Sequence, residues 1–287
     1  MSDSSPPMGQ TGTSSLQVIR RIGVWLLAWT GLFYLCFWGF AKIPDLGIVS
    51  SVWISGIICS LSTFGILCAL ITTPISRRMM AVILMSCIGA NIAINQVAGA
   101  VVPSGGIAAG HLHMGINVTL LGVAVCGGVL LSCGVRKKTY IIPLVLAAGM
   151  ADIWSTTLGV TRQVIQSPVA MNHLLIHFPV IGRGVQPLVG ITDFAFAALF
   201  MSMAGRFHLS VKKTQLVVGA SFVIAITMAV ISGHGTPVLP IMGILFIAFI
   251  AAHYRDIKVI DPREKKEALM GLFIIAIALI VITLLKS

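Results

Sequence analysis

Charge and paired cysteines are both scarce in this chain. Only eight of its 287 residues are acidic, and charged residues of both signs make up 9%. A soluble domain carries about 25% charged residues, so a largely water-exposed surface is excluded. The six cysteines include no Cys-x-x-Cys pair, the usual pattern of a zinc site or a redox dithiol. We expect small buried thiols, and we expect no metal or other cofactor.

Long apolar segments are what the chain has instead. Hydrophobic residues make up 57%, and apolar runs recur from Trp25 to the C-terminus. Runs of about 18 residues or more can cross a hydrocarbon core as helices. Their composition lacks the alternation of barrel strands, so the sequence predicts an all-α polytopic membrane protein. We place about nine transmembrane helices, at roughly 22–41, 47–73, 79–102, 114–134, 140–160, 186–205, 214–232, 236–253 and 267–285.

These spans divide the chain into regions. Residues 1–21 are polar and are expected to form a disordered cytoplasmic tail, and residues 22–134 a four-helix membrane region. Residues 135–253 form the region with buried acids, and 254–287 a basic loop with an extra helix. The connection 161–185 is too apolar for a solvated linker, which favours a surface-lying or re-entrant segment or a lid.

Basic residues are distributed unevenly across the predicted membrane. The net charge is +11, and 15 of the 19 basic residues fall in connections on one side, with four on the other. The positive-inside rule places the N-terminus in the cytoplasm and the C-terminus outside, which suits a prokaryotic cytoplasmic membrane. Since topology explains the charge, we expect no nucleic-acid partner.

Two aspartates, Asp152 and Asp193, are the only acidic residues inside the predicted spans, since Glu267 lies at the boundary of the last one. An ionisable group at membrane depth costs several kcal/mol unless it is paired or hydrated, so it indicates a functional site. Counted along their helices from the external side, both lie about 10–12 Å deep at a rise of about 1.5 Å per residue. Consecutive helices are usually neighbours, so we expect the two carboxyls to face each other.

Such a pair has a defined chemistry. Two close carboxylates in a low dielectric cannot both ionise, so one keeps its proton. One member can then activate water while the other protonates a leaving group. The residues alone leave two alternatives open: a neutral carboxylic acid hydrogen-bonded between helices, or a proton or cation relay in a transporter.

The residues around the aspartates follow a known order. Helix five contains Gly149-Met150-Ala151-Asp152, helix six begins with Gly190-Ile191-Thr192-Asp193, and Pro237-Val238-Leu239-Pro240 comes two helices later. This order resembles the intramembrane aspartyl proteases of the presenilin and signal peptide peptidase families, whose pattern is YD, then GxGD, then PAL or PALP. The resemblance covers roughly residues 140–253, which would form a presenilin-like catalytic half.

The resemblance implies that Asp152 and Asp193 form a catalytic pair that hydrolyses peptide bonds within transmembrane or signal-peptide helices. Its expected partners are a membrane-embedded peptide or protein and the lipid bilayer; the oligomeric state stays open. A proline pair that opens a helix leaves carbonyls free to bind a substrate backbone, and a glycine allows close helix approach. The residues expected to place the substrate are Gly190, Thr192, Pro237, Val238, Leu239 and Pro240.

The chain departs from the family pattern at several positions. Ala151 replaces the tyrosine before the first aspartate, Thr192 replaces the second glycine, and Val238 replaces the alanine of PAL. Four predicted helices, instead of the family's five, precede the first aspartate helix. A transporter that uses the same acids and a catalytically inactive presenilin-like scaffold are therefore the alternative functions.

Histidines and amides supply the remaining polar groups. The pairs His111/His113 and His173/His177 could bind metal, but no HExxH motif supports this, and hydrogen-bonded or interfacial histidines are expected. Helix three carries a polar stripe that predicts interhelical hydrogen bonds or a water path, formed by Asn91, Asn95 and Gln96.

Overall fold

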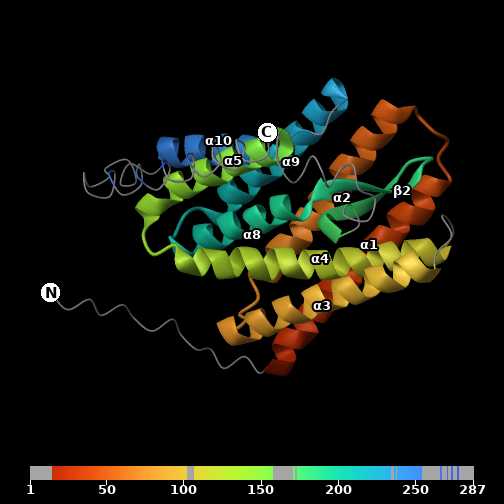
Figure 1. Cartoon of the computed structure of the whole chain (residues 1–287), viewed down its shortest axis with the longest axis horizontal. Helices are drawn as coiled ribbons and strands as arrows, with labels where there is room; N and C mark the ends of the chain where they lie inside the picture. Colours follow the sequence, from red (N-terminus) through yellow and green to blue (C-terminus); the bar gives the residue numbers. More distant parts are fainter. Residues whose placement is uncertain are drawn as a thin grey trace.

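The computed structural model describes residues 15–101, 107–157, 171, 173–233, 236, 238–253, 266, 270, 273 and 277. Eight α-helices, one 3-10 turn and one β-hairpin make up these segments (Figure 1). The helices are α1 (Ser15–Ala41), α2 (Ile48–Ile71), α3 (Arg77–Val101), α4 (Ile107–Gly134), α5 (Ile141–Thr157), α8 (Ile191–Arg206), α9 (Val211–Ser232) and α10 (Val238–His253). The hairpin consists of β1 (Leu175–Val180) and β2 (Gly184–Gly190), and the 3-10 turn η1 (Lys138–Tyr140) precedes α5.

Five of the described helices are long and apolar enough to cross a membrane: α1, α2, α3, α4 and α9. The helices α5, α8 and α10 are apolar but shorter, with 17, 16 and 16 residues. The architecture is therefore that of a mostly helical, multi-pass membrane protein. The predicted span 267–285 falls outside the described residues, apart from 270, 273 and 277.

The prediction of helix over residues 186–205 is wrong at its start. Residues 184–190 form β2, which pairs antiparallel with β1, and α8 begins only at Ile191. Pro187 has no N–H to donate within a helix, and Gly182 and Gly184 turn the chain with φ of 69° and 74°. The segment is a short apolar run, which periodicity alone cannot assign to helix or strand.

The first helix also differs from its prediction. It begins at Ser15, so the last part of the predicted tail, residues 15–21, is helical. The helix includes Arg20 and Arg21. Long basic side chains are compatible with this position, because their charged ends can reach water while their aliphatic stems stay in the apolar layer. The other described helices begin and end within a few residues of their predicted bounds, except α4, which starts at Ile107 and not at 114.

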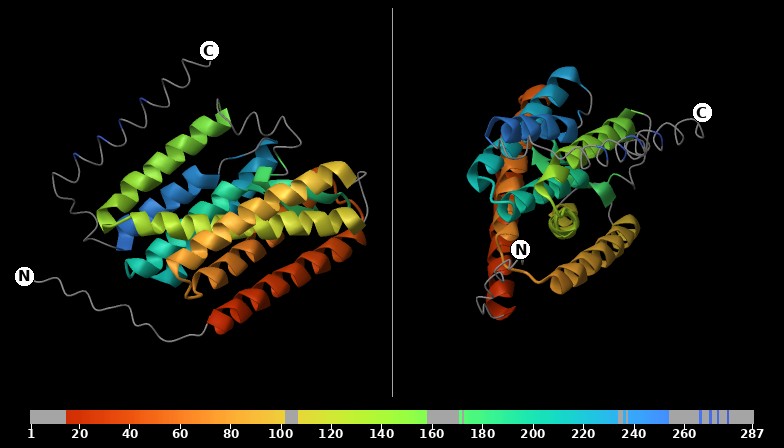
Figure 2. Two further views of the ribbon diagram at one scale, coloured as in Figure 1. Left: turned by 60° about the horizontal axis from the view of Figure 1, so that its bottom comes forward. Right: turned by 90° about the vertical axis from the view of Figure 1, so that its left-hand side faces the viewer.

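The helix α8 forms the centre of the bundle. It packs against α4, α9 and α2, and Phe194, Phe200 and Met203 are almost completely buried. The helix α3 packs chiefly against α4 and lies at the edge of the bundle (Figure 2). Buried thiols were predicted, and four of the six cysteines are buried: Cys36, Cys59, Cys68 and Cys126. Cys87 and Cys133 are only half-buried.

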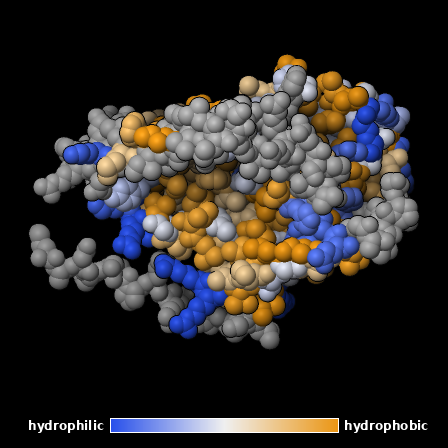
Figure 3. All heavy atoms as spheres, viewed as in Figure 1, coloured by the Kyte–Doolittle hydropathy of each residue, from blue (hydrophilic) through white to orange (hydrophobic). Residues whose placement is uncertain are grey.

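The outer surface of the helical bundle is apolar along the middle of its long helices. Hydrophobic residues cover the middle of the visible face, and hydrophilic residues gather towards its two ends (Figure 3). Leu27, Met85 and Leu216 are 73%, 68% and 75% exposed. Such side chains on the outside of a helix are suited to contact with lipid. In water they would form a large exposed apolar patch, which soluble proteins rarely have.

Candidate active site

Asp193 lies in the first turn of the central helix. Gly190 is the N-cap of α8, and the Asp193 carboxyl, three residues later, accepts a hydrogen bond from the Gly190 backbone N–H. This is the reciprocal half of a capping box, in which an acidic side chain satisfies an N–H that has no partner within the helix. The Asp193 side chain is 8% exposed. The position of Asp193 is set by the junction between β2 and α8. It is not set by a depth along a longer helix, as the sequence analysis assumed.

Asp152 lies in α5 and faces the start of α10. Its carboxyl accepts a hydrogen bond from the backbone N–H of Leu239, the second residue of α10. The first N–H groups of a helix have no partners within that helix and attract negative charge. The backbone of α5 lies against the start of α10 at Gly149, where an added Cβ would meet the Pro240 Cα at 3.7 Å, an ordinary contact.

The two predicted carboxyls lie within electrostatic range of each other. Asp152 and Asp193 lie close enough for their charges to interact through space. They meet by a different route from the one expected, because α5 packs mainly on α10 while α8 packs on α4, α2 and α9. The N-terminus of α10 contacts Asp152, and direct packing of α5 on α8 is not one of the main contacts.

The other predicted residues take different positions around this pair. A Cβ added to Gly190 would lie 3.2 Å from the Asp193 Oδ2, so glycine keeps the space beside this carboxyl open. Thr192 is exposed, Val238 and Leu239 are buried, and Pro240 is half-buried. Pro237 lies outside the described residues. The segment Val238–Pro240 and Gly190 are thus next to the acids. Thr192 is exposed, but its Oγ1 would lie 3.3 Å from a Cβ added to Gly190, so it borders the same position as the Asp193 carboxyl.

Asn117 is a functional candidate that the sequence analysis missed. Its carboxamide Nδ2 donates to the His177 carbonyl at 2.6 Å, and its Oδ1 accepts from the His177 N–H at 2.8 Å. The side chain is completely buried in α4 and serves β1 as a third strand would. A lone asparagine in an apolar span was the available signal, since polar groups at this depth need partners.

We expect Asn117→Leu to loosen the hairpin. Leucine leaves the buried N–H and C=O of His177 unsatisfied, at a cost of about 1–3 kcal/mol for such a group. Hydrogen exchange of the β1 amides should accelerate accordingly. Asn95→Leu is the control, because the Asn95 carboxamide bonds only to Asn91 within α3 and should leave β1 exchange unchanged. Equal protection in Asn117→Leu and the native protein would contradict the role of this side chain.

The four histidines considered as metal ligands contact different residues and do not surround a common point. The hydroxyl of Tyr34 hydrogen-bonds His111, and His173 Nδ1 lies 3.3 Å from Asn91 Oδ1. His113 and His177 stack with ring centroids 4.5 Å apart. The His173/His177 pair does not share a helix face, because His177 lies in β1. Within the described segments, no three His, Cys, Asp or Glu residues are placed to hold a metal ion.

One residue of the polar stripe of α3, Asn91, makes the expected interhelical hydrogen bond, and Asn95 bonds within α3. Asn91 Nδ2 donates to Thr119 Oγ1 of α4 at 3.0 Å, and Asn95 Nδ2 donates to the Asn91 carbonyl at 2.9 Å. Together with His173, these groups tie α3 to α4 and to the segment before β1. Gln96 is exposed on α3.

Comparison with protein-family models, with curated proteins and with solved structures finds no match to this chain. The function is therefore inferred from the geometry of the site.

Proposed function

We propose that this protein is an intramembrane aspartyl protease that cleaves transmembrane or signal-peptide helices. One observation carries the proposal: segments far apart in the chain meet around two acids. Asp152 accepts a hydrogen bond from Leu239, Asp193 accepts one from Gly190, and the two carboxyls interact through space. An acid with a purely structural role would need only a hydrogen-bond partner such as a backbone N–H. Peptide hydrolysis needs a second carboxyl as well, with both within reach of one water.

The proposed reaction needs only the pair and water. One carboxyl is ionised and takes a proton from water, whose oxygen attacks the carbonyl carbon of the peptide bond. The other carboxyl is protonated and donates to the carbonyl oxygen, giving a tetrahedral diol. Transfer of a proton to the amide nitrogen breaks the C–N bond. The products are a carboxylic acid and an amine, and one water is consumed.

The hairpin offers a place for an unwound substrate. The outer side of β1 is occupied, since Asn117 binds His177 and Ser55 Oγ accepts from the Ile181 N–H at 3.1 Å. Strand β2 is therefore the side of the sheet on which an extended substrate segment would add by backbone hydrogen bonds. Since β2 ends at Gly190, a segment paired with it runs towards Asp193.

The proposal includes an orientation. The hairpin tip and the α1–α2 connection lie at one end of the bundle, and the α4–α5 and α8–α9 connections lie at the other (Figure 1). The basic loop residues Arg136, Lys137 and Arg206 belong to the second end, which we assign to the cytoplasm. The acids then open towards the outside of a prokaryotic cytoplasmic membrane.

The test is cleavage by the purified protein in liposomes. A reporter with one apolar helix is incubated in H₂¹⁸O, and we expect fragments cut within that helix that carry ¹⁸O in the new carboxyl terminus. A peptide with a hydroxyethylene group in place of the scissile amide should inhibit, because it mimics the tetrahedral state. Absence of cleavage over a panel of helices, together with proton flux through the same liposomes, would instead support the transporter.

A further inference from the structure

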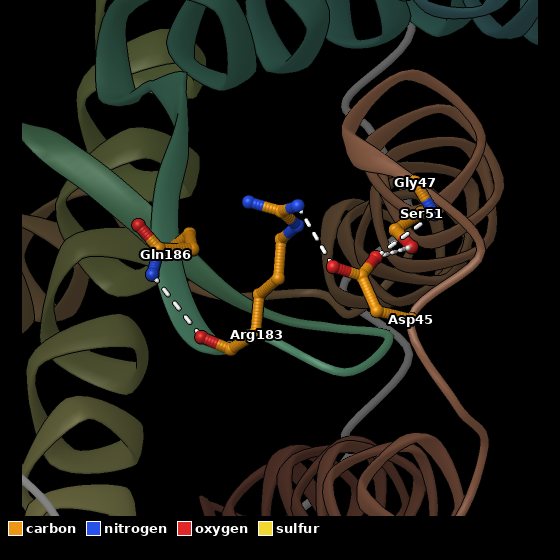
Figure 4. Close-up of polar contacts among 5 residues, drawn as sticks. All are labelled: Asp45, Gly47, Ser51, Arg183 and Gln186. Carbon is orange, nitrogen blue, oxygen red and sulfur yellow. Dashed lines mark hydrogen bonds and ion pairs between the residues drawn. The ribbon is translucent and has the colours of Figure 1, made fainter.

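The tip of the hairpin is fastened to the loop between α1 and α2 (Figure 4). Arg183 Nη2 donates to Asp45 Oδ2 at 2.8 Å. The other carboxylate oxygen of Asp45 accepts from the Gly47 N–H at 3.0 Å and from Ser51 Oγ at 3.1 Å. Asp45 is thus fixed through its Oδ1 at the N-terminus of α2, where negative charge is favourable, and its Oδ2 binds Arg183.

The Asp45 carboxyl is ionised when it binds Arg183. Partial desolvation raises the pKa of its carboxyl, but the hydrogen bonds from Ser51 and Gly47 and the charge of Arg183 outweigh it, so the pKa lies below its usual value. The carboxylate is therefore charged at neutral pH and available to the guanidinium.

Backbone contacts hold the β1 side of the same tip. The Ile181 N–H donates to Ser55 Oγ, and the Gly182 N–H donates to the Phe40 carbonyl at 3.4 Å. A Cβ added to Gly182 would lie 2.9 Å from the Asp45 Cα, so only glycine fits this approach. Arg183 is the next residue and directly precedes β2. Its N–H donates to the Val180 carbonyl at 3.0 Å and Gly184 pairs with Val180, so the ion pair adds a side-chain contact to a tip that the backbone already holds.

Strand β2 connects this ion pair to the candidate active site. It runs from Gly184 to Gly190, and the Gly190 N–H holds the Asp193 carboxyl. An extended strand spans about 3.3 Å per residue and has little slack along its axis. The register shifts once, between the pairs His177–Pro187 and Ile176–Val189, so the ladder is interrupted at Leu188. A shift of the first residue of β2 therefore reaches Gly190 only through the pairs with β1 on both sides of this irregularity.

We propose that Asp45 and Arg183 are a positioning pair for the candidate active site: by fixing the start of β2 they set the orientation of the Asp193 carboxyl. This inference rests on the proposed protease function for its catalytic consequence, but not for its structural one. The pair is a third to two-fifths exposed, with side chains 33% and 43% accessible for Arg183 and Asp45. Its effect is therefore graded and sensitive to salt, since exposed ion pairs are weak and screened.

The test uses the full chain with matched variants. Asp45→Asn keeps an acceptor for Gly47 and Ser51 and removes only the charge, and Arg183→Gln removes the partner charge. Arg183→Lys is the conservative rescue, because the pair rests on a single N–O contact. Lys42→Gln is the control, as it removes a positive charge from the same connection without touching Asp45 or Arg183.

We expect Asp45→Asn and Arg183→Gln to accelerate hydrogen exchange over residues 184–190 about threefold, the scale of an exposed ion pair, and to shift the infrared band of the Asp193 carboxyl, identified by its loss in Asp193→Asn. The kcat of reporter cleavage should fall about threefold with KM unchanged, and Arg183→Lys should restore most of each effect. High salt should reproduce part of the change in the native protein and none in Arg183→Gln.

Two results separate this inference from the function. If the native protein cleaves no reporter, the exchange and infrared measurements still decide whether the pair positions Asp193. If it cleaves, and Arg183→Gln leaves both measurements at native values or Lys42→Gln changes them equally, the positioning role is overturned while the protease proposal stands.

Discussion

Replacing Asp193 with Asn is expected to lower the rate of reporter cleavage about 1,000-fold or more, the scale of loss when a group of a catalytic pair is removed. Asparagine has the same shape and can still accept from the Gly190 N–H, so the start of α8 should keep its structure. It cannot take up or release a proton, which the proposed reaction requires at each step. Asp152→Asn should cause a loss of similar size.

The double variant Asp152→Asn/Asp193→Asn gives the sharper result. Groups that act as a unit are not additive, so the double variant should be no slower than either single one. Initial rates on the liposome reporter measure this, with Glu264→Gln as an acid-to-amide control outside the predicted spans. Losses that multiply, or full cleavage by either single variant, would show that the two carboxyls do not share one reaction.

The second large effect is expected at the contact between α4 and α8. Gly128 of α4 faces Ala195 and Ala198, and a Cβ added there would clash with the Ala195 carbonyl and lie 2.7 Å from the Ala198 Cβ and 2.9 Å from the Leu199 nitrogen. Backbone atoms cannot move aside as a flexible side chain can. We therefore expect Gly128→Ala to destabilise the protein by about 3 kcal/mol, the upper part of the range for overpacking.

Gly127 provides the control for this prediction. It is adjacent in the same helix, but a Cβ added there meets nothing within 4 Å. Gly127→Ala should therefore be neutral or mildly stabilising, because alanine favours helix. Thermal unfolding in detergent should show a lower midpoint for Gly128→Ala only. Cleavage should fall as well, since Ala195 lies in the same turn as Asp193. Equal midpoints for the two variants would contradict the close packing of α4 and α8.

Parts of the site were predictable because they depend on residue type and chain order. Asp152 and Asp193 stand out as acids in apolar segments, where a charge is costly, and the flanking Gly190 and Leu239 lie in short motifs. The structure places these residues together. The hairpin was not predictable, because β1 and β2 are apolar runs too short to distinguish strand from helix, and their pairing depends on Asn117 and Ser55 from other helices.

By itself, the sequence determined the class of protein: its apolar length and sparse charge indicate a multi-pass membrane protein, and its two acids in apolar segments predict a site. Tertiary structure alone decided how the acids are held. Asp193 is fixed by a strand-to-helix junction, Asp152 by the N-terminus of α10, and the hairpin by Asp45 and Asn117. Hydrogen bonds between distant segments carry no periodic signal in the chain, because each needs only one donor and one acceptor brought together by packing.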